Sequence, residues 1–183
     1  MLRGLHANNG WKVLTLALSI LAVASMSGCL DFFSNDISND QKNADAHVAK
    51  PAFDFTVTDT EGYNFTLSNQ TGHVVILDFM WISCAACDAM VPTMKMIQNN
   101  YDNIVIMEIT VEPLDTMKDM AQYRKDKNIT WELARDYNGT LKKAYSVAAA
   151  PTYYLIAKNQ TVAWAQVGTC DYSTFNDEIA KII

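Results

Sequence analysis

Positive charge is scarce in this chain of 183 residues. It has 14 Lys and Arg against 20 Asp and Glu, and its net charge at pH 7 is −6. Residues 1–28 hold two of the basic residues and no acid, so residues 29–183 carry 12 basic side chains against 20 acidic ones, a net charge of −8. Such a chain repels phosphate backbones and anionic lipid headgroups. We therefore expect no nucleic-acid partner and no electrostatic attachment to membranes.

Side chains that bind metals are also few. The chain has three His and four Cys, and it lacks both a second close Cys pair and an H-x(3–5)-H motif. A zinc site needs four ligands, which usually come from such pairs. The one close pair, Cys84 and Cys87, therefore favours a redox dithiol. A metal site and a pair of inert buried thiols are the two alternatives.

The place of this pair along the chain supports the redox interpretation. It follows the apolar run Val74–Phe79, which is typical of a buried strand, and it precedes a stretch with helical spacing, Asp88–Asn99. The first turn of a helix presents unpaired N–H groups and a partial positive charge, which favour a thiolate at Cys84. Cys87 lies one helical turn further on, close enough to form a disulfide with Cys84.

The N-terminal segment has the pattern of an export signal. A basic start with Arg3 and Lys12 is followed by an apolar stretch and then by small residues before Cys29. The sequence Ser25-Met26-Ser27-Gly28-Cys29 resembles the lipobox of prokaryotic lipoproteins, in which the cysteine is lipidated and becomes the new N-terminus. We predict a signal peptide over residues 1–28 and a lipid on Cys29. The alternative is an uncleaved anchor, because Val13–Leu30 has no charge over 18 residues, about the length that spans a membrane.

Residues 29–50 are predicted to be a disordered tether. Residues 31–50 are rich in Asn, Asp, Ser, Gln and Lys and poor in branched apolar side chains, so they cannot form a packed core. The rest of the chain, residues 51–183, amounts to roughly 130 residues, which is the size of one ordinary domain with its own core.

The apolar pattern of this domain predicts an α/β fold with a mixed central sheet flanked by helices. Two short strands on either side of Glu61-Gly62 are expected to form an N-terminal β-hairpin extension. The predicted strands cover residues 53–58, 63–67, 74–80, 104–111, 131–133, 152–156 and 162–167, and the predicted helices cover 88–99, 113–127, 139–145 and 172–183. Met90, Met94 and Ile97 recur at helical spacing, which favours core packing over a copper-binding methionine cluster.

Several motifs together resemble the thioredoxin fold. They are Leu77-Asp78-Phe79, the Cys-Ala-Ala-Cys sequence, Pro92 five residues after the second cysteine, and Ala150-Pro151-Thr152 before a strand. The runs GHVVILDFMWISCAACDAMVPTM and LARDYNGTLKKAYSVAAAPTYYLIAKNQTVAWAQVG, with the Phe-Asp-Phe hairpin, are similar to the membrane-anchored TlpA/ResA branch. The resemblance covers Pro51–Ile183. It departs from the family at Ala85-Ala86, where a pair containing Pro is frequent, at Ser83, where Trp is common, and at Asp88, which is often basic.

The resemblance implies roles for three residues at the dithiol. Cys84 would attack a substrate disulfide as a thiolate, and Cys87 would resolve the mixed disulfide. Asp78 would lie beneath the pair, where burial raises its proton affinity and suits it to take the proton of Cys87. The alternative for Asp78 is a structural acid that is bonded to a nearby Lys or hydroxyl.

Other residues would shape the surroundings of the dithiol. Pro151 would be a cis-proline that faces it, and the backbone at Ala150 would pair with an extended substrate segment; the alternative is an ordinary trans-proline. Pro92 would kink the helix. Trp81 would either flank the dithiol as an apolar contact surface or belong to the core. Cys170 is either a third functional thiol or an idle cysteine.

The sequence therefore predicts a thiol–disulfide oxidoreductase tethered to the cell membrane on its extracytoplasmic side. Its substrates would be cysteines of other exported proteins, a membrane dithiol protein would supply electrons, and no bound cofactor is expected. Ala85-Ala86 offers no charge or side-chain donor to a thiolate, and Asp78 and Asp88 would repel one, so we predict a reductant. A peroxidase is disfavoured because the P-x-x-x-T-x-x-C signature is absent. A copper or haem-protein assembly chaperone that uses the thiols as ligands is the other alternative.

Overall fold

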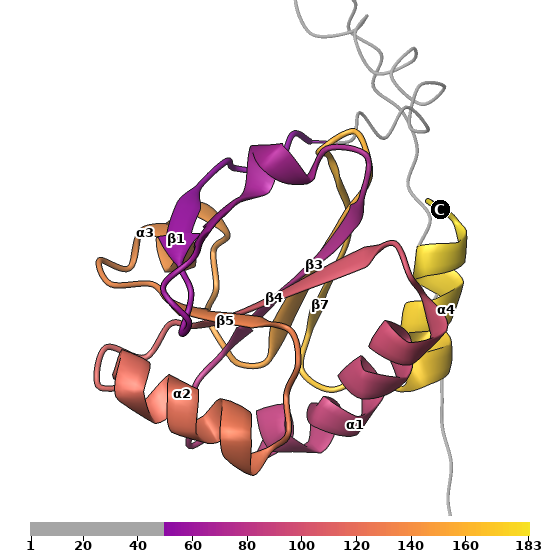
Figure 1. Ribbon diagram of the computed structural model, residues 1–183. Helices are drawn as coiled ribbons and strands as arrows, with labels where there is room; N and C mark the ends of the chain where they lie inside the picture. The colour runs from indigo at the N-terminus through magenta and orange to yellow at the C-terminus, as the bar shows by residue number, and fades with distance from the viewer. Residues whose placement is uncertain (1–49) are drawn as a thin grey trace, which may run out of the picture. The chain divides into compact units, whose positions relative to one another are not determined.

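A five-stranded mixed sheet forms the centre of residues 50–183, the part of the chain that this computed structural model describes (Figure 1). The strands run in the order β5-β4-β3-β6-β7. They are β3 (Val74–Met80), β4 (Ile104–Thr110), β5 (Glu132–Arg135), β6 (Thr152–Ile156) and β7 (Val162–Val167). The predicted signal peptide, Cys29 and almost all of the predicted tether lie outside the described residues.

Strand β3 lies in the middle of the sheet and is buried along its whole length. It pairs in parallel with β4 and antiparallel with β6, while β5 continues the parallel part and β7 the antiparallel part. A strand covered on both faces must be almost entirely apolar, which explains the Val-Val-Ile-Leu-Asp-Phe-Met sequence of β3. The mixed sheet agrees with the predicted α/β thioredoxin fold.

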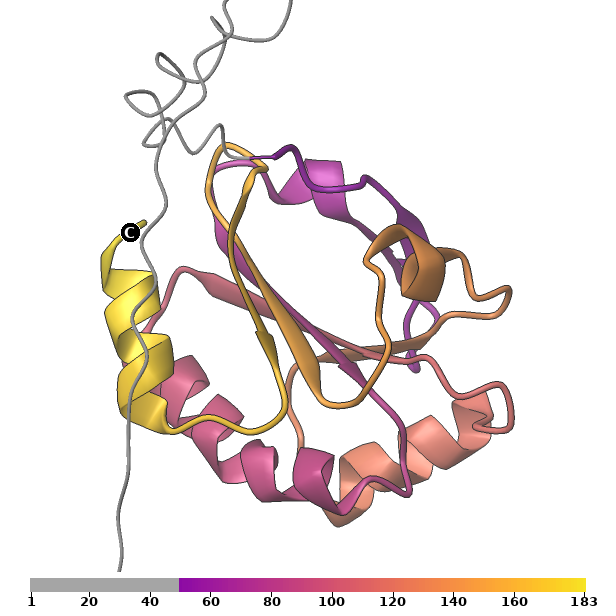
Figure 2. The same cartoon turned by 180° about the vertical axis from the view of Figure 1, so that it is seen from behind.

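Helices cover one face of the sheet, and the N-terminal hairpin and a short helix cover the other (Figures 1 and 2). The first layer consists of α1 (Ala85–Asn100), α2 (Met117–Asp126) and α4 (Tyr172–Ala180). The second consists of β1 (Thr56–Thr58), β2 (Asn64–Thr66), the 3-10 turn η1 (Leu67–Gln70) and α3 (Thr140–Ala144). Because side chains alternate along a strand, the even-numbered residues of β3 face the first layer and the odd-numbered residues face the second.

The cores on both faces contain aromatic rings, and the two cysteines belong to only one of them. The face toward α1, α2 and α4 buries the two cysteines together with Met90, Met94 and Ile97, which confirms that the helical spacing of these three residues reflects core packing. The face toward the hairpin is rich in aromatic rings. Tyr145, for example, packs against Phe55 and Phe79.

Several element boundaries differ from the sequence predictions; strand β1, for example, begins at Thr56 and not at residue 53, and α4 ends at Ala180 and not at residue 183. Helix α1 begins at Ala85, three residues earlier than predicted, because Cys84 is its N-cap. Helix α2 begins at Met117, and not near Pro113, because Thr116 and Asp119 form a reciprocal capping box that sets the start. The second strand of the hairpin ends at Thr66, and the chain continues as the 3-10 turn η1.

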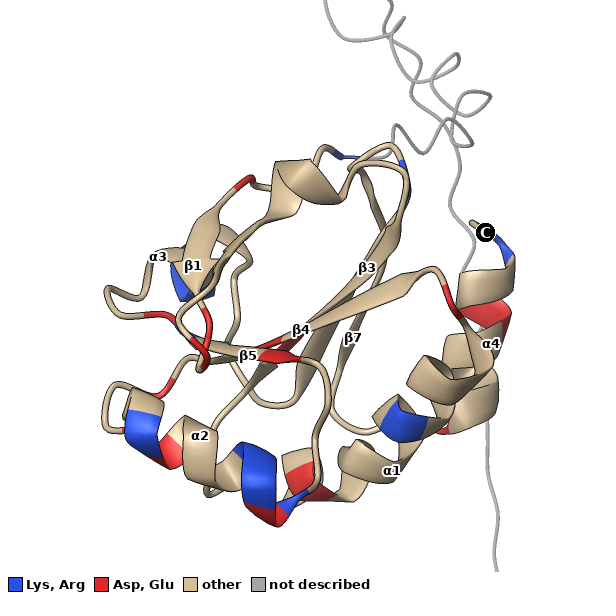
Figure 3. Ribbon diagram, in the orientation of Figure 1, with Lys and Arg blue, Asp and Glu red and all other residues tan. Residues whose placement is uncertain are grey.

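Charged residues lie mainly on the outer helices and loops, but acidic residues also occur within the sheet (Figure 3). Asp78 on β3 and Glu108 on β4 are both buried. Among residues 50–183, no helix is both long enough and apolar enough to cross a membrane.

Candidate active site

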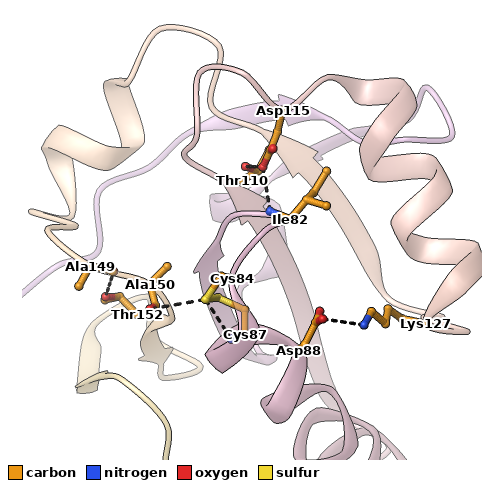
Figure 4. Close-up of a disulfide and its surroundings, with 10 residues drawn as sticks. All are labelled: Ile82, Cys84, Cys87, Asp88, Thr110, Asp115, Lys127, Ala149, Ala150 and Thr152. Atoms are coloured by element: carbon orange, nitrogen blue, oxygen red, sulfur yellow. Dashed lines mark hydrogen bonds and ion pairs between the residues drawn. A yellow bond between two sulfur atoms is a disulfide. The ribbon is translucent and has the colours of Figure 1, made fainter.

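Cys84 and Cys87 form a disulfide at the N-terminal end of α1 (Figure 4). The sulfur of Cys84, the N-cap residue, accepts the backbone N–H of Cys87 at 3.0 Å. It therefore lies where the unpaired N–H groups and the dipole of the helix favour negative charge. Both cysteines are buried, with Cys84 7% exposed and Cys87 5% exposed. The two therefore differ in their position on the helix much more than in their exposure to solvent.

The loop that leads into the dithiol is held by an acid from the next strand–helix connection. The carboxylate of Asp115 accepts the backbone N–H of Ile82 at 2.9 Å and the hydroxyl of Thr110 at 2.6 Å (Figure 4). The parallel strands β3 and β4 end at the same edge of the sheet, so the loop after β4 can reach the loop after β3. Sequence reasoning did not single out Asp115, because nothing local marks a contact across 33 residues.

A third loop contacts the dithiol from the side of β6. The peptide bond between Ala150 and Pro151 is cis, and the carbonyl oxygen of Ala150 lies 3.7 Å from the sulfur of Cys84. A disulfide sulfur has no hydrogen, so this contact can become a hydrogen bond only when Cys84 is a thiol. Two hydrogen bonds hold this loop. The backbone N–H of Gly168 donates to the carbonyl oxygen of Pro151 at 2.8 Å, and the hydroxyl of Thr152 donates to the carbonyl oxygen of Ala149 at 2.7 Å.

Asp78 is buried on β3, on the face of the sheet that packs against both cysteines. Its Oδ1 atom is buried and has no hydrogen-bond partner in residues 50–183. Burial, and then the charge of Glu108, raise the pKa of Asp78 well above its ordinary value of 3.8. No Lys or hydroxyl in the described part of the chain bonds to Asp78, so the partner that a purely structural role requires is missing there.

Glu108 is a second buried acid on the same face, and sequence reasoning missed it. Its Oε2 atom accepts the indole N–H of Trp131 at 2.6 Å. Burial raises the pKa of Glu108 to about 7, while the hydrogen bond from Trp131 acts in the opposite direction. An acid within the apolar run Ile104–Val111 was the available signal, and it is the same kind of signal that drew attention to Asp78.

Three other predicted residues lie around the pair. Trp81 is partly buried and packs against the cores on both faces of the sheet. Pro92 lies within α1 and is exposed. Asp88, in the first turn of α1, forms an ion pair with Lys127 at 2.7 Å (Figure 4), so its charge repels a Cys84 thiolate less than the sequence alone suggested.

Cys170 is a free, partly buried cysteine that packs against the core containing the dithiol. It follows Gly168, whose backbone is bonded to Pro151, so its loop runs beside the cis-proline. Burial, and then the charge of Asp171, raise the pKa of Cys170 to about 11. This thiol is therefore protonated, and weakly nucleophilic, at neutral pH.

Two further features of the described residues lie apart from this chemistry. A pocket of about 540 Å³ is lined by residues of α3, β6, β7 and the start of the domain, and neither cysteine lines it. Within residues 50–183, no three His, Cys, Asp or Glu side chains are grouped so that they could hold a metal ion.

Comparisons with known proteins agree on the class of chemistry. A model of the AhpC/TSA family matches residues 48–165. The thiol-disulfide oxidoreductase ResA of Bacillus cereus is 26% identical over 149 residues, which cover 80% of this chain and 84% of the relative. ResA of Geobacillus kaustophilus is 27% identical over 154 residues, which cover 84% of both chains. A crystal structure assigned to a thiol:disulfide interchange protein, DsbE, of Chlorobium tepidum superimposes with a TM-score of 0.68 at 25% identity and covers 73% of this chain and 96% of that one.

Proposed function

This chain belongs to the AhpC/TSA family and is a thioredoxin-like thiol–disulfide oxidoreductase, and we propose that it reduces disulfides of other exported proteins while tethered to a membrane. The observation that carries the proposal is the Cys84–Cys87 disulfide at the start of α1, with the sulfur of Cys84 beside the carbonyl oxygen of Ala150. In this arrangement the sulfur of Cys84 faces the loop that would hold a substrate, and Cys87 lies one helical turn away.

The catalytic cycle starts from the reduced dithiol. The Cys84 thiolate attacks one sulfur of a substrate disulfide, a new S–S bond forms, and the other substrate sulfur leaves with the electron pair as a thiolate. Cys87 then gives up its proton to Asp78 and attacks the sulfur of Cys84, the bond to the substrate breaks, and the second substrate thiolate leaves. The substrate has gained two electrons, and the protein is left with the Cys84–Cys87 disulfide. A dithiol protein in the membrane would reduce that disulfide and complete the cycle.

A reducing direction follows from the weak stabilisation of a Cys84 thiolate. The backbone N–H of Cys87 and the helix N-terminus favour the thiolate. Against it stand the carbonyl oxygen of Ala150, 3.7 Å away, and the negative charge that Glu108, on the face of the sheet toward the pair, carries when it is ionised. Ala85 and Ala86 add no donor. A thiolate with little stabilisation makes the disulfide the more stable form, so the reduced protein gives electrons away.

The proposed location rests on the N-terminal sequence pattern. A signal peptide over residues 1–28, a lipid on Cys29 and a polar tether to residue 50 would hold the domain near the outer surface of a cell membrane. Ala150 would pair with an extended segment of the substrate, and Trp81 would provide apolar contact next to the dithiol.

Trapping of mixed disulfides in the native host tests this function. In a Cys170→Ser background, Cys87→Ser should accumulate adducts with exported proteins, because the trapped bond to Cys84 can no longer be resolved. Cys84→Ser should form none, because the attacking thiolate is gone. Cys170→Ser alone is the matched control and should show no accumulation. Equal adduct formation by the Cys84 and Cys87 variants would contradict the division of roles, and copper that stays bound through purification would favour the chaperone alternative.

A further inference from the structure

Two buried acids lie on neighbouring strands, on the face of the sheet that packs against the dithiol. Asp78 on β3 and Glu108 on β4 are register partners in a parallel pair, so both side chains project from the same face of the sheet. Strands in a sheet are about 4.8 Å apart. That face packs against α1, whose first turn contains Cys87. None of the salt bridges in residues 50–183 involves either carboxyl group.

The two carboxyl groups differ in their hydrogen bonds. The indole N–H of Trp131 donates to Glu108 at 2.6 Å, and a donor of this kind stabilises the ionised form of an acid. Oδ1 of Asp78 is buried without any partner in the described residues, which favours the neutral form. The pKa shifts have matching causes, since the charge of Glu108 adds to burial in raising the pKa of Asp78 well above its ordinary value, while the hydrogen bond from Trp131 opposes the burial that raises the pKa of Glu108 to about 7. When the pair carries one negative charge, Glu108 holds it.

We propose that Asp78 and Glu108 form a carboxyl dyad in which Asp78 carries a proton and Glu108 is the ionised member that allows the dyad to accept another. This inference rests on the dithiol function proposed above and names a residue that acts through Asp78. During resolution, the proton of Cys87 passes to Asp78 as the proton of Asp78 passes to Glu108. The Cys84–Cys87 bond forms, the bond from Cys84 to the substrate breaks, and the substrate sulfur leaves with its electron pair. The dyad finishes with two protons, and it loses one when the dithiol is reduced and Cys87 becomes a thiol again.

The other groups near the dyad do not replace it in this pH range. Tyr153 on β6 is the register partner of Asp78, and Tyr123 comes from α2; burial and then nearby acids raise the pKa of each phenol, so both stay neutral. Asp88 on α1 contributes a negative charge that raises the pKa of Glu108 and is itself paired with Lys127. Cys170 adds to the raised pKa of Tyr153 but is a protonated thiol at neutral pH.

The pH dependence of the resolution step tests the dyad. The full-length protein, purified in mild detergent with Cys170→Ser as the common background, is reduced and mixed rapidly with dithiobis(nitrobenzoate). The first release of coloured thiol reports attack by Cys84, and the second reports resolution by Cys87. In this background the second rate should rise with pH around the pKa of Glu108, about 7.

Two variants separate the dyad from a structural role. Glu108→Gln keeps an acceptor for Trp131 but removes the charge, so only Asp78 can accept the proton. The second phase should shift to higher pH and slow by about tenfold or more at pH 7, while the first phase should not slow, because the dyad takes up no proton in the attack by Cys84. Trp131→Phe keeps both carboxyl groups and removes the donor that favours ionised Glu108. Its profile should also shift to higher pH.

The outcomes decide between the dyad and the function on which it rests. Second-phase profiles of both variants that superimpose on the parent profile would overturn the dyad, since folding defects cannot leave rates unchanged. If Glu108→Gln does not fold, the Trp131→Phe profile decides alone. A parent protein that shows no second phase at any pH would instead contradict the proposed dithiol cycle. In the Asp78→Asn variant, the rate of the second phase should no longer rise with pH near neutrality. A rate that still rises would show that Asp78 takes no part in the proton transfer.

Discussion

Replacement of Glu108 by Gln should stabilise the domain at neutral and alkaline pH and leave its stability unchanged in acid. Glu108 is 2% exposed, forms no salt bridge in the described residues, and keeps one hydrogen bond, from Trp131. Its pKa is about 7 in the folded protein against an ordinary value of 4.5. Between pH 4.5 and 7, the unfolded chain has therefore lost this proton while the folded chain still holds it. A folded state that binds more protons than the unfolded state loses stability as the pH rises.

The size of the effect follows from the shift in pKa. Each pKa unit corresponds to about 1.4 kcal/mol, so ionisation of Glu108 costs the folded state about 3 kcal/mol once the pH exceeds 7. Gln has a similar shape and can accept the same N–H of Trp131, but it never ionises. Loss of the charge on residue 108 also lowers the pKa of Asp78, and this change acts in the same direction. The advantage of Glu108→Gln should grow from near zero at pH 4 to about 3 kcal/mol at pH 8.

Urea unfolding of the disulfide-bonded protein at a series of pH values measures this difference. Glu132→Gln is a matched control, because Glu132 lies on the adjacent strand β5 and is partly exposed. We expect that variant to stay within roughly 0.5 kcal/mol of the wild type at every pH. The reasoning is refuted if the difference between Glu108→Gln and the wild type is the same at pH 4 and pH 8, or if the wild type is the more stable protein at pH 8.

Two further predictions concern the direction of electron transfer and the attachment of the protein to the membrane. The weakly stabilised Cys84 thiolate should give a reduction potential nearer the thioredoxin end of the range, about −270 mV, than the strong-oxidant end, about −120 mV, when the protein is equilibrated with glutathione or dithiothreitol; a value above roughly −180 mV would reverse the proposed direction. Cys29→Ser should abolish labelling by a radioactive fatty acid and stop cleavage at that position, whereas an intact Met1 on the wild-type membrane protein would establish the uncleaved anchor instead.

The sequence by itself determined the local structure and the reactive pair. An uninterrupted apolar run predicts a strand buried on both faces, and helical spacing of apolar residues predicts the helix that follows, so the place of Cys84 and Cys87 at their junction could be derived without coordinates. The same logic identified Asp78 as a buried acid. Helix and strand periodicities depend on residues that are close together in the chain, so they can be recognised from the sequence alone.

Only the tertiary structure decided what lies around the pair. The register of β3 against β4 sets Glu108 beside Asp78, although 30 residues separate them in the chain, and the shared edge of those strands brings Asp115 to the backbone of Ile82. The start of α2 likewise depended on a capping box that competed with Pro113. Strand register is set by the packing of whole faces of the sheet, because a slip of one residue would turn every side chain of a strand toward the opposite layer. No local sequence pattern specifies the register of β3 against β4. That register puts both Asp78 and Glu108 on the face of the sheet that packs against the disulfide.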